Sequence, residues 1–126
     1  MLTLSEIESA AALVHDVLAP TPTHCWPLLA ARSGAEVWVK HENHTPIGAF
    51  KVRGGIVYMK RLRQAEPGLA GIVTATRGNH GQSVAFAAAR AGLSATIVVP
   101  HGNSTEKNAA MRAFGGELIE HGHDFQ

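Results

Sequence analysis

The chain has 126 residues, a formal net charge of +1 with histidine neutral, and 45% hydrophobic residues. This composition is typical of a soluble globular protein, and the length favours a single domain. The balanced charge gives no basic field for nucleic acid, and no apolar run approaches the roughly 18 residues needed to span a bilayer. We therefore expect no nucleic-acid partner and no membrane association. The single cysteine, Cys25, allows no internal disulfide and favours a cytoplasmic location.

The first half of the chain predicts short elements separated by prolines. Ser5 and Glu8 have capping-box spacing, and the apolar residues that follow have helical periodicity, so we expect an amphipathic helix over residues 5–19. Residues 20–27 contain three prolines and predict an extended linker. Four further elements are expected: a short helix over 28–33 ended by Gly34, a strand over 36–40, a loop over 41–48 and a helix from about 49 to 63.

Strands and helices alternate in the second half. Strands are predicted over 71–75, 95–99 and 117–120, and helices over 78–91 and from Asn103 or Ser104 to Phe114. This order indicates βαβ units and therefore an α/β fold with a parallel sheet. Because parallel sheets normally have both faces covered, three strands and two helices make a thin domain. We expect more protein to follow, with residues 121–126 beginning another element.

A glycine-containing turn, TATRGNHGQS, follows the first of these strands at residues 74–83. A helix that begins near Gly78 presents free N–H groups and the positive end of its dipole, which together favour an anion. Asn79 and His80 add side-chain hydrogen-bonding groups. The spacing matches neither the dinucleotide fingerprint nor the P-loop. The alternative is that the glycines only make a tight turn.

Lys51 lies in the first turn of the helix predicted from about residue 49. The helix dipole and the neighbouring Arg53 both disfavour an ammonium ion there, and a neutral amine is what Schiff-base chemistry requires. The alternative is an ordinary solvated lysine. Gly54 and Gly55 each cost about 1 kcal/mol against alanine inside a helix. They indicate close approach of a backbone or a ligand, or else a break in the helix.

Two segments resemble the signatures of fold-type II pyridoxal-phosphate (PLP) enzymes. KHENHTPIGAFKVRGG, at residues 40–55, resembles the family's Lys-x-Glu…Pro-x-Gly-Ser-Phe-Lys-x-Arg-Gly pattern. TRGNHGQSVAFAA, from Thr76, resembles the Ser-x-Gly-Asn-His-x-Gln pattern. The two occur in the family's order, and the resemblance extends from Thr21-Pro22 to GGELIEHG. The Asn-His form is similar to the serine/threonine dehydratase and serine racemase branch.

The resemblance implies a fold and a reaction. The fold would be the N-terminal portion of a tryptophan synthase β-like enzyme. Residues 1–48 would form a strip of the large PLP domain, and residues 49–126 most of a small, truncated βαβ domain. The complete protein, expected to be a homo-oligomer, would eliminate the β-hydroxyl group of L-threonine or L-serine with PLP. The products of this amino-acid substrate would be a 2-oxo acid and ammonia.

The resemblance also implies a role for individual residues. Lys51 would carry PLP as a Schiff base and then act as acid and base at the substrate α-carbon. Phe50 would pack against the pyridine ring, and Asn79 would donate a hydrogen bond to the phenolic oxygen of the cofactor. The substrate carboxylate would be held at the second helix start by four residues: Thr76, Gly78, Asn79 and His80.

Some features depart from the family pattern. Arg77 stands where relatives carry Ser or Ala, and racemases use that Ser as a second acid and base. Because arginine stays protonated, racemisation is not expected. HGNSTEK, at 101–107, replaces the usual Ala-Pro, and no glycine run for the PLP phosphate occurs. A racemase-like enzyme, another β-hydroxy amino acid lyase and a non-catalytic remnant remain as alternatives. His121 and His123 have no third ligand at a telling spacing, so we expect no metal.

Overall fold

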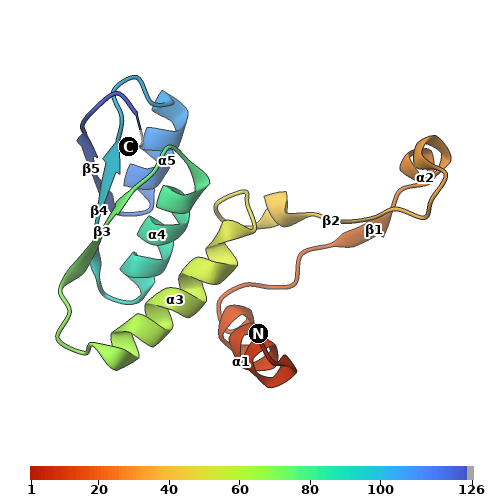
Figure 1. Cartoon of the computed structure of the whole chain (residues 1–126), viewed down its shortest axis with the longest axis horizontal. Helices are drawn as coiled ribbons and strands as arrows, with labels where there is room; N and C mark the ends of the chain where they lie inside the picture. The colour runs from red at the N-terminus through yellow and green to blue at the C-terminus, as the bar shows by residue number, and fades with distance from the viewer. Residues whose placement is uncertain (125–126) are drawn as a thin grey trace.

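A computed structural model describes residues 1–124, and Phe125 and Gln126 lie outside the described residues. Figure 1 shows an α/β body that contains the second half of the chain, with an N-terminal helix beside it and a hairpin that extends away from it. The expectation that residues 121–126 begin another element falls partly outside this range, and His121–Asp124 form no helix or strand.

The body is built on a parallel sheet of three strands in the order β3-β4-β5. The strands are β3 (Gly71–Ala75), β4 (Ser94–Val99) and β5 (Gly116–Glu120), and they are connected by α4 (Asn79–Arg90) and α5 (Thr105–Ala113). The predicted parallel α/β fold is therefore confirmed. The strand and helix bounds agree with the prediction to within two residues, and the cap of α5 is Ser104, whose hydroxyl accepts the N–H of Lys107.

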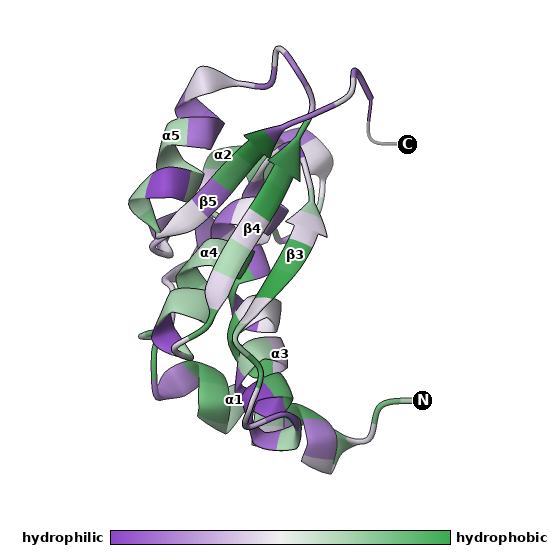
Figure 2. Ribbon diagram, turned by 90° about the vertical axis from the view of Figure 1, so that its left-hand side faces the viewer, coloured by the Kyte–Doolittle hydropathy of each residue, from purple (hydrophilic) through white to green (hydrophobic). Residues whose placement is uncertain are grey.

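The two faces of the sheet have different environments. Ala95, Ile97 and Val99 of β4 are buried against α4 and α5. On the opposite face, Val73 is 75% exposed and Ile119 is 47% exposed. Figure 2 shows the strands in front and the helices behind them. Within residues 1–124, nothing covers the second face of this sheet.

Helix α3 (Lys51–Ala65) packs against α4. The contact is close because the facing surface of α4 consists of small residues, and Met59 of α3 is buried against Val84, Ala87 and Ala88. The predicted helix over residues 49–63 is confirmed, with a start two residues later and an end two residues later. The glycine pair does not break it.

The N-terminal helix differs from the prediction. Helix α1 spans Leu4–His15, and its capping box is formed by Thr3 and Glu6. The predicted box of Ser5 and Glu8 and the predicted span 5–19 are therefore wrong. After His15 the chain tightens into a turn in which the N–H of Val17 bonds the carbonyl of Val14 at 3.0 Å. Val14 and Leu18 are buried against α3 and the segment before it.

The extended hairpin contains a strand that the sequence did not predict. β1 (Thr23–Cys25) pairs antiparallel with β2 (Trp38–Lys40). The predicted linker over residues 20–27 therefore contains a strand, and the strand predicted over 36–40 is shortened to residues 38–40. Helix α2 (Pro27–Ser33) lies between the strands and ends at Gly34, as predicted. A 3₁₀ turn, η1 (Glu42–His44), leads back to the body. No helix within residues 1–124 is long and apolar enough to cross a membrane.

Candidate functional site

Lys51 is the first residue of α3, as predicted. Phe50 is the N-cap residue and makes no side-chain capping bond, and its side chain is 66% exposed. The Lys51 side chain is exposed, and its amine has no hydrogen-bond or ion-pair partner within residues 1–124. The start of α3 therefore carries an amine without a partner and an exposed aromatic ring.

A buried hydroxyl on α4 holds the backbone of Lys51. Ser83 is 2% exposed, and its hydroxyl donates a 2.8 Å hydrogen bond to the Lys51 carbonyl. A Cβ atom added at Gly55 would collide with the Ser83 side chain and approach its carbonyl to 3.0 Å. The close approach predicted from the glycine pair thus occurs at Gly55. At Gly54 a Cβ atom would meet nothing within 4 Å among the residues described.

The start of α4 contains the four residues predicted to hold the substrate carboxylate. The backbone N–H groups of Asn79 and His80, and the Asn79 side chain, have no acceptor in the described part of the chain. The other groups are already engaged. Thr76 is buried, and its hydroxyl accepts the N–H of Gly78 at 3.2 Å. The His80 ring lies 3.2 Å from the hydroxyl of Thr74. The free donors of this turn are therefore those of Asn79 and the His80 backbone.

The fold brings the starts of α3 and α4 together. Ser83 lies one helical turn after Asn79, about 6 Å along the axis of α4, and it bonds Lys51 directly. A cleft of about 430 Å³ lies beside this contact, between α3, β3 and α4. Gly54, Thr74, His80 and Ser83 contribute to its lining. The first turn of α3 is thus fixed to α4 one helical turn after the free donors of Asn79 and His80.

The structure corrects the expected environment of Lys51. Arg53 is not an unpaired cation, because its Nε and Nη2 donate to the two carboxylate oxygens of Glu42 at 2.7 and 2.9 Å. These hydrogen bonds from Arg53, aided by one from the Thr21 hydroxyl and opposed by burial, lower the pKa of Glu42 to about 2. The charge of Arg53 is therefore largely compensated next to the predicted reactive lysine.

Two further basic groups lie at the start of α4. The amine of Lys107 reaches back from α5, so that a Cβ atom added at Gly78 would lie 3.1 Å from it. Lys107 was not among the site residues expected from the sequence, although it lies in HGNSTEK, where the chain departs from the family pattern. Arg77 donates 2.9 Å and 3.4 Å hydrogen bonds to the Asp124 carboxylate and the His123 carbonyl. The Lys107 amine therefore favours an anion at this turn, whereas the charge of Arg77 is compensated by Asp124.

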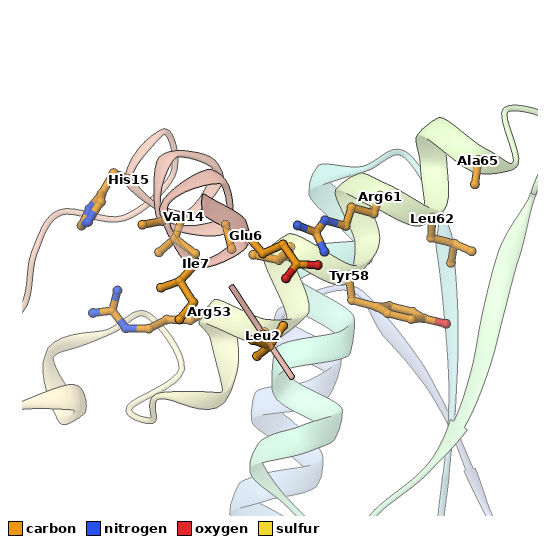
Figure 3. A pocket seen from close by; sticks show the side chains of 14 residues that line it. Leu2, Glu6, Ile7, Val14, His15, Arg53, Tyr58, Arg61, Leu62 and Ala65 are labelled. Atoms are coloured by element: carbon orange, nitrogen blue, oxygen red, sulfur yellow. The ribbon is translucent and has the colours of Figure 1, made fainter. Parts of the chain in front are cut away.

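A larger groove lies between α1 and α3. It has a volume of about 770 Å³, and its mainly apolar lining includes Leu2, Ile7, Val14 and Leu62 (Figure 3). It shares Gly54 and Tyr58 with the cleft beside Ser83. Among residues 1–124, no group of three or more His, Cys, Asp or Glu side chains is arranged to hold a metal.

Comparison with known proteins agrees with this geometry. The chain is 35% identical over 122 residues to the biosynthetic L-threonine dehydratase IlvA of Haemophilus influenzae, covering 97% of this chain and 24% of that protein. A pyridoxal 5'-phosphate-dependent aspartate racemase superposes with a TM-score of 0.89 at 32% identity, over 96% of this chain and 38% of that one. Threonine deaminase isoform 2 of Solanum lycopersicum superposes with a TM-score of 0.78 at 30% identity, over 98% of this chain and 37% of that one.

The chain therefore spans about a quarter of the first of these relatives and less than two fifths of the two solved structures. The family model described as "Pyridoxal-phosphate dependent enzyme" matches residues 14–126, which include both helix starts and the whole sheet. The chain belongs to the pyridoxal-phosphate dependent enzyme family.

Proposed function

We propose that this chain forms the lysine-bearing part of a PLP-dependent ammonia-lyase that dehydrates and deaminates L-threonine or L-serine. The observation that carries the proposal is that Lys51 has an unpaired amine and that its backbone carbonyl is bonded by Ser83, one helical turn after the free donors at the start of α4. An amine next to an anion site suits a lyase that must hold an amino acid by its carboxylate while a proton is moved at its α-carbon.

The residues present fit the reactive end of PLP. The Lys51 amine is free to attach to the aldehyde carbon, Phe50 is exposed beside it, and the Asn79 amide is free to donate to the phenolic oxygen. When bound, PLP supplies the electron sink that makes the substrate α-proton removable. These three residues, rather than a phosphate-binding loop, are what this chain contributes to the cofactor.

The same residues provide the groups for the elimination. The Lys51 amine would take the α-proton of the substrate and return it to the β-hydroxyl group, which would leave as water. The backbone N–H groups of Asn79 and His80 hold the substrate carboxylate, and the Lys107 amine adds positive charge near Gly78. The enamine product takes up water and releases ammonia and a 2-oxo acid, so the reaction needs no oxidant. Thr76 keeps the turn in shape through its bond to the Gly78 N–H.

A racemase is the second candidate, because the structural similarity to an aspartate racemase is high. Arg77 opposes it, since a guanidinium group that remains protonated cannot exchange a proton on the second face of the substrate. A non-catalytic remnant is the third, and it is supported only by the small share of the relatives that the chain spans.

Covalent trapping tests the proposal. The chain is incubated with PLP, reduced with borohydride, digested and mapped by mass spectrometry. We expect the reduced pyridoxyl group chiefly on Lys51 and expect Lys51→Ala to lose it. A product spread over Lys40, Lys60 and Lys107 without preference for Lys51 would end the assignment. In a protein that carries this chain with the remainder of the family fold, 2-oxobutanoate from L-threonine is the matching activity.

A further inference from the structure

We infer that Glu42 and Arg53 are a positioning pair for Lys51: their two-point hydrogen bond holds the uncapped first turn of α3 in the place from which the Lys51 amine reacts. The inference deepens the proposed function and rests on it, because it assumes that Lys51 is the amine that carries PLP.

The first turn of α3 lacks the usual support of a helix start. A helix leaves its first N–H groups without partners, and a side-chain cap normally satisfies one of them. Phe50 occupies the N-cap position and cannot do so. The remaining local contact is a tight turn in which the N–H of Arg53 bonds the Phe50 carbonyl at 3.1 Å. Such an end frays unless another contact holds it.

Arg53 supplies that contact. It lies in the same turn as Lys51, two residues later, and its guanidinium meets the Glu42 carboxylate through parallel bonds of 2.7 and 2.9 Å. Bidentate, charge-assisted bonds of this kind define direction as well as distance. The side chains are only 25% and 20% exposed, so water screens the pair less than it screens a surface ion pair.

Glu42 is itself held by a second segment of the chain. The buried Thr21 hydroxyl donates to the same carboxylate at 2.6 Å, and the Lys40 amine donates to the Thr21 carbonyl at 3.2 Å. The carboxylate therefore connects the first turn of α3 to the chain on both sides of the hairpin. Together with the Ser83 bond to the Lys51 carbonyl, this ties the turn to α4 and adds a polar attachment to the N-terminal part, beside the packing of buried Val52 against Val14 and Leu18.

The test compares two lysines of the same helix. Lys60 is exposed on α3, has no partner within residues 1–124, and lies far from the pair along the helix. In trapping, a lysine amine condenses with the PLP aldehyde with loss of water, and borohydride delivers hydride to the carbon–nitrogen double bond. The ratio of product on Lys51 to product on Lys60, in one digest, then measures how well Lys51 is placed.

Two variants separate position from charge. Glu42→Gln leaves Arg53 without a charged partner, and Arg53→Met removes the main cationic partner of Glu42, which keeps Thr21 and the Lys40 amine 3.9 Å away. We expect both to lower the Lys51:Lys60 ratio by roughly five- to tenfold, because both lose the charged hydrogen bonds. If the pair acted only through its electric field, the extra cation would raise the ratio and the extra anion would lower it. Opposite changes, or an unchanged ratio in both variants, would overturn the inference.

Matched measurements keep the result interpretable. Glu106→Gln removes a carboxylate from the exposed face of α5 and should leave the ratio unchanged. Circular dichroism reports whether each variant is folded. If Arg53→Met does not fold, Arg53→Lys keeps the charge without the two-point geometry, and a wild-type ratio in that variant contradicts the inference. If the wild-type chain itself shows no preference for Lys51 over Lys60, the proposed function is wrong. That result differs from a failure of the positioning inference, in which the wild type prefers Lys51 but the variants do not lose the preference.

Discussion

Glu42 has the most perturbed carboxylate in the described part of the chain, and this has a consequence for acid stability. Its pKa in the folded protein is about 2, below the ordinary 4.5, because Arg53 and Thr21 bond its ionised form. The stabilisation is therefore complete above about pH 4.5 and is lost as the pH falls toward 2.

We expect Glu42→Gln to lower the free energy of unfolding at pH 7 by roughly 1–3 kcal/mol. We also expect the variant to lose less stability than the wild type between pH 4.5 and 2.5. Urea denaturation at several pH values measures both effects. An acid profile parallel to that of the wild type would show that Glu42 does not hold a depressed pKa.

Arg77 determines whether the second face of the substrate has a proton carrier. Its guanidinium is committed to Asp124 and the His123 carbonyl, and it remains charged at every physiological pH. For a protein that contains this chain and turns over L-serine, we expect pyruvate to form much faster than D-serine. Chiral chromatography alongside a pyruvate assay gives the two rates. D-serine as the main product would favour the racemase.

At the scale of elements, the glycine pair of α3 offers two neighbouring substitutions with opposite expected effects. Gly55→Ala places a methyl group against Ser83, where both α3 and α4 are closely packed, and should destabilise the protein by about 1–3 kcal/mol. Gly54→Ala meets open space and gains helix propensity, so it should stabilise by up to about 1 kcal/mol. Thermal melting of the two variants tests this pair. Equal losses would mean that the α3–α4 contact is looser than described.

The same elements show what the sequence could predict. β3, β4 and α4 are delimited by glycine and proline and have clear periodicity, so their bounds were predicted closely. β1 has three residues between Pro22 and Pro27, which is too short to show a period, and its pairing depends on a partner across α2. For α1, two overlapping capping patterns competed, and the sequence alone did not reveal that Thr3 with Glu6 prevails over Ser5 with Glu8.

For the site, the sequence predicted the positions of residues along the chain but not the contacts between them. The sequence predicted Lys51 in the first turn of one helix and another helix from Gly78, and the structure starts these helices at Lys51 and Asn79. The Ser83 bond, the reach of Lys107 to Gly78 and the pairing of Arg53 with Glu42 depend on how helices pack and on side-chain direction. Those contacts join residues that no local spacing relates, and so the sequence did not predict them.

On the scale of the whole molecule, the polar junction at Lys51 is accompanied by two uncovered apolar surfaces. One is the face of the sheet that carries Val73 and Ile119, and the other is the groove between α1 and α3. Exposed apolar surfaces of this kind favour self-association. We expect the purified 126-residue chain to show concentration-dependent association in analytical ultracentrifugation. A monodisperse monomer across a hundredfold range of concentration would contradict this.

The last prediction concerns how much of the cofactor this chain can hold. Tight binding of PLP needs its doubly charged phosphate to be bound. Gly54 and Gly55 cannot form a phosphate-binding loop, because their backbone lies inside α3. Gly116 cannot form one either, because it is buried at the start of β5. The start of α4 is the anion site with nearby positive charge from Lys107, and it is assigned to the substrate carboxylate. One set of free donors cannot serve both anions.

We therefore expect the 126-residue chain to react with excess PLP at Lys51 but to bind it weakly and to give no measurable dehydration of threonine. Titration followed by the absorbance of the lysine–PLP adduct measures affinity, and 2-oxobutanoate formation measures turnover. Inorganic phosphate should compete poorly with PLP, because the aldehyde rather than the phosphate makes the main contact. Stoichiometric binding at low micromolar PLP with steady turnover would show that the α4 start binds the phosphate, and that the carboxylate assignment of Asn79 and His80 is wrong.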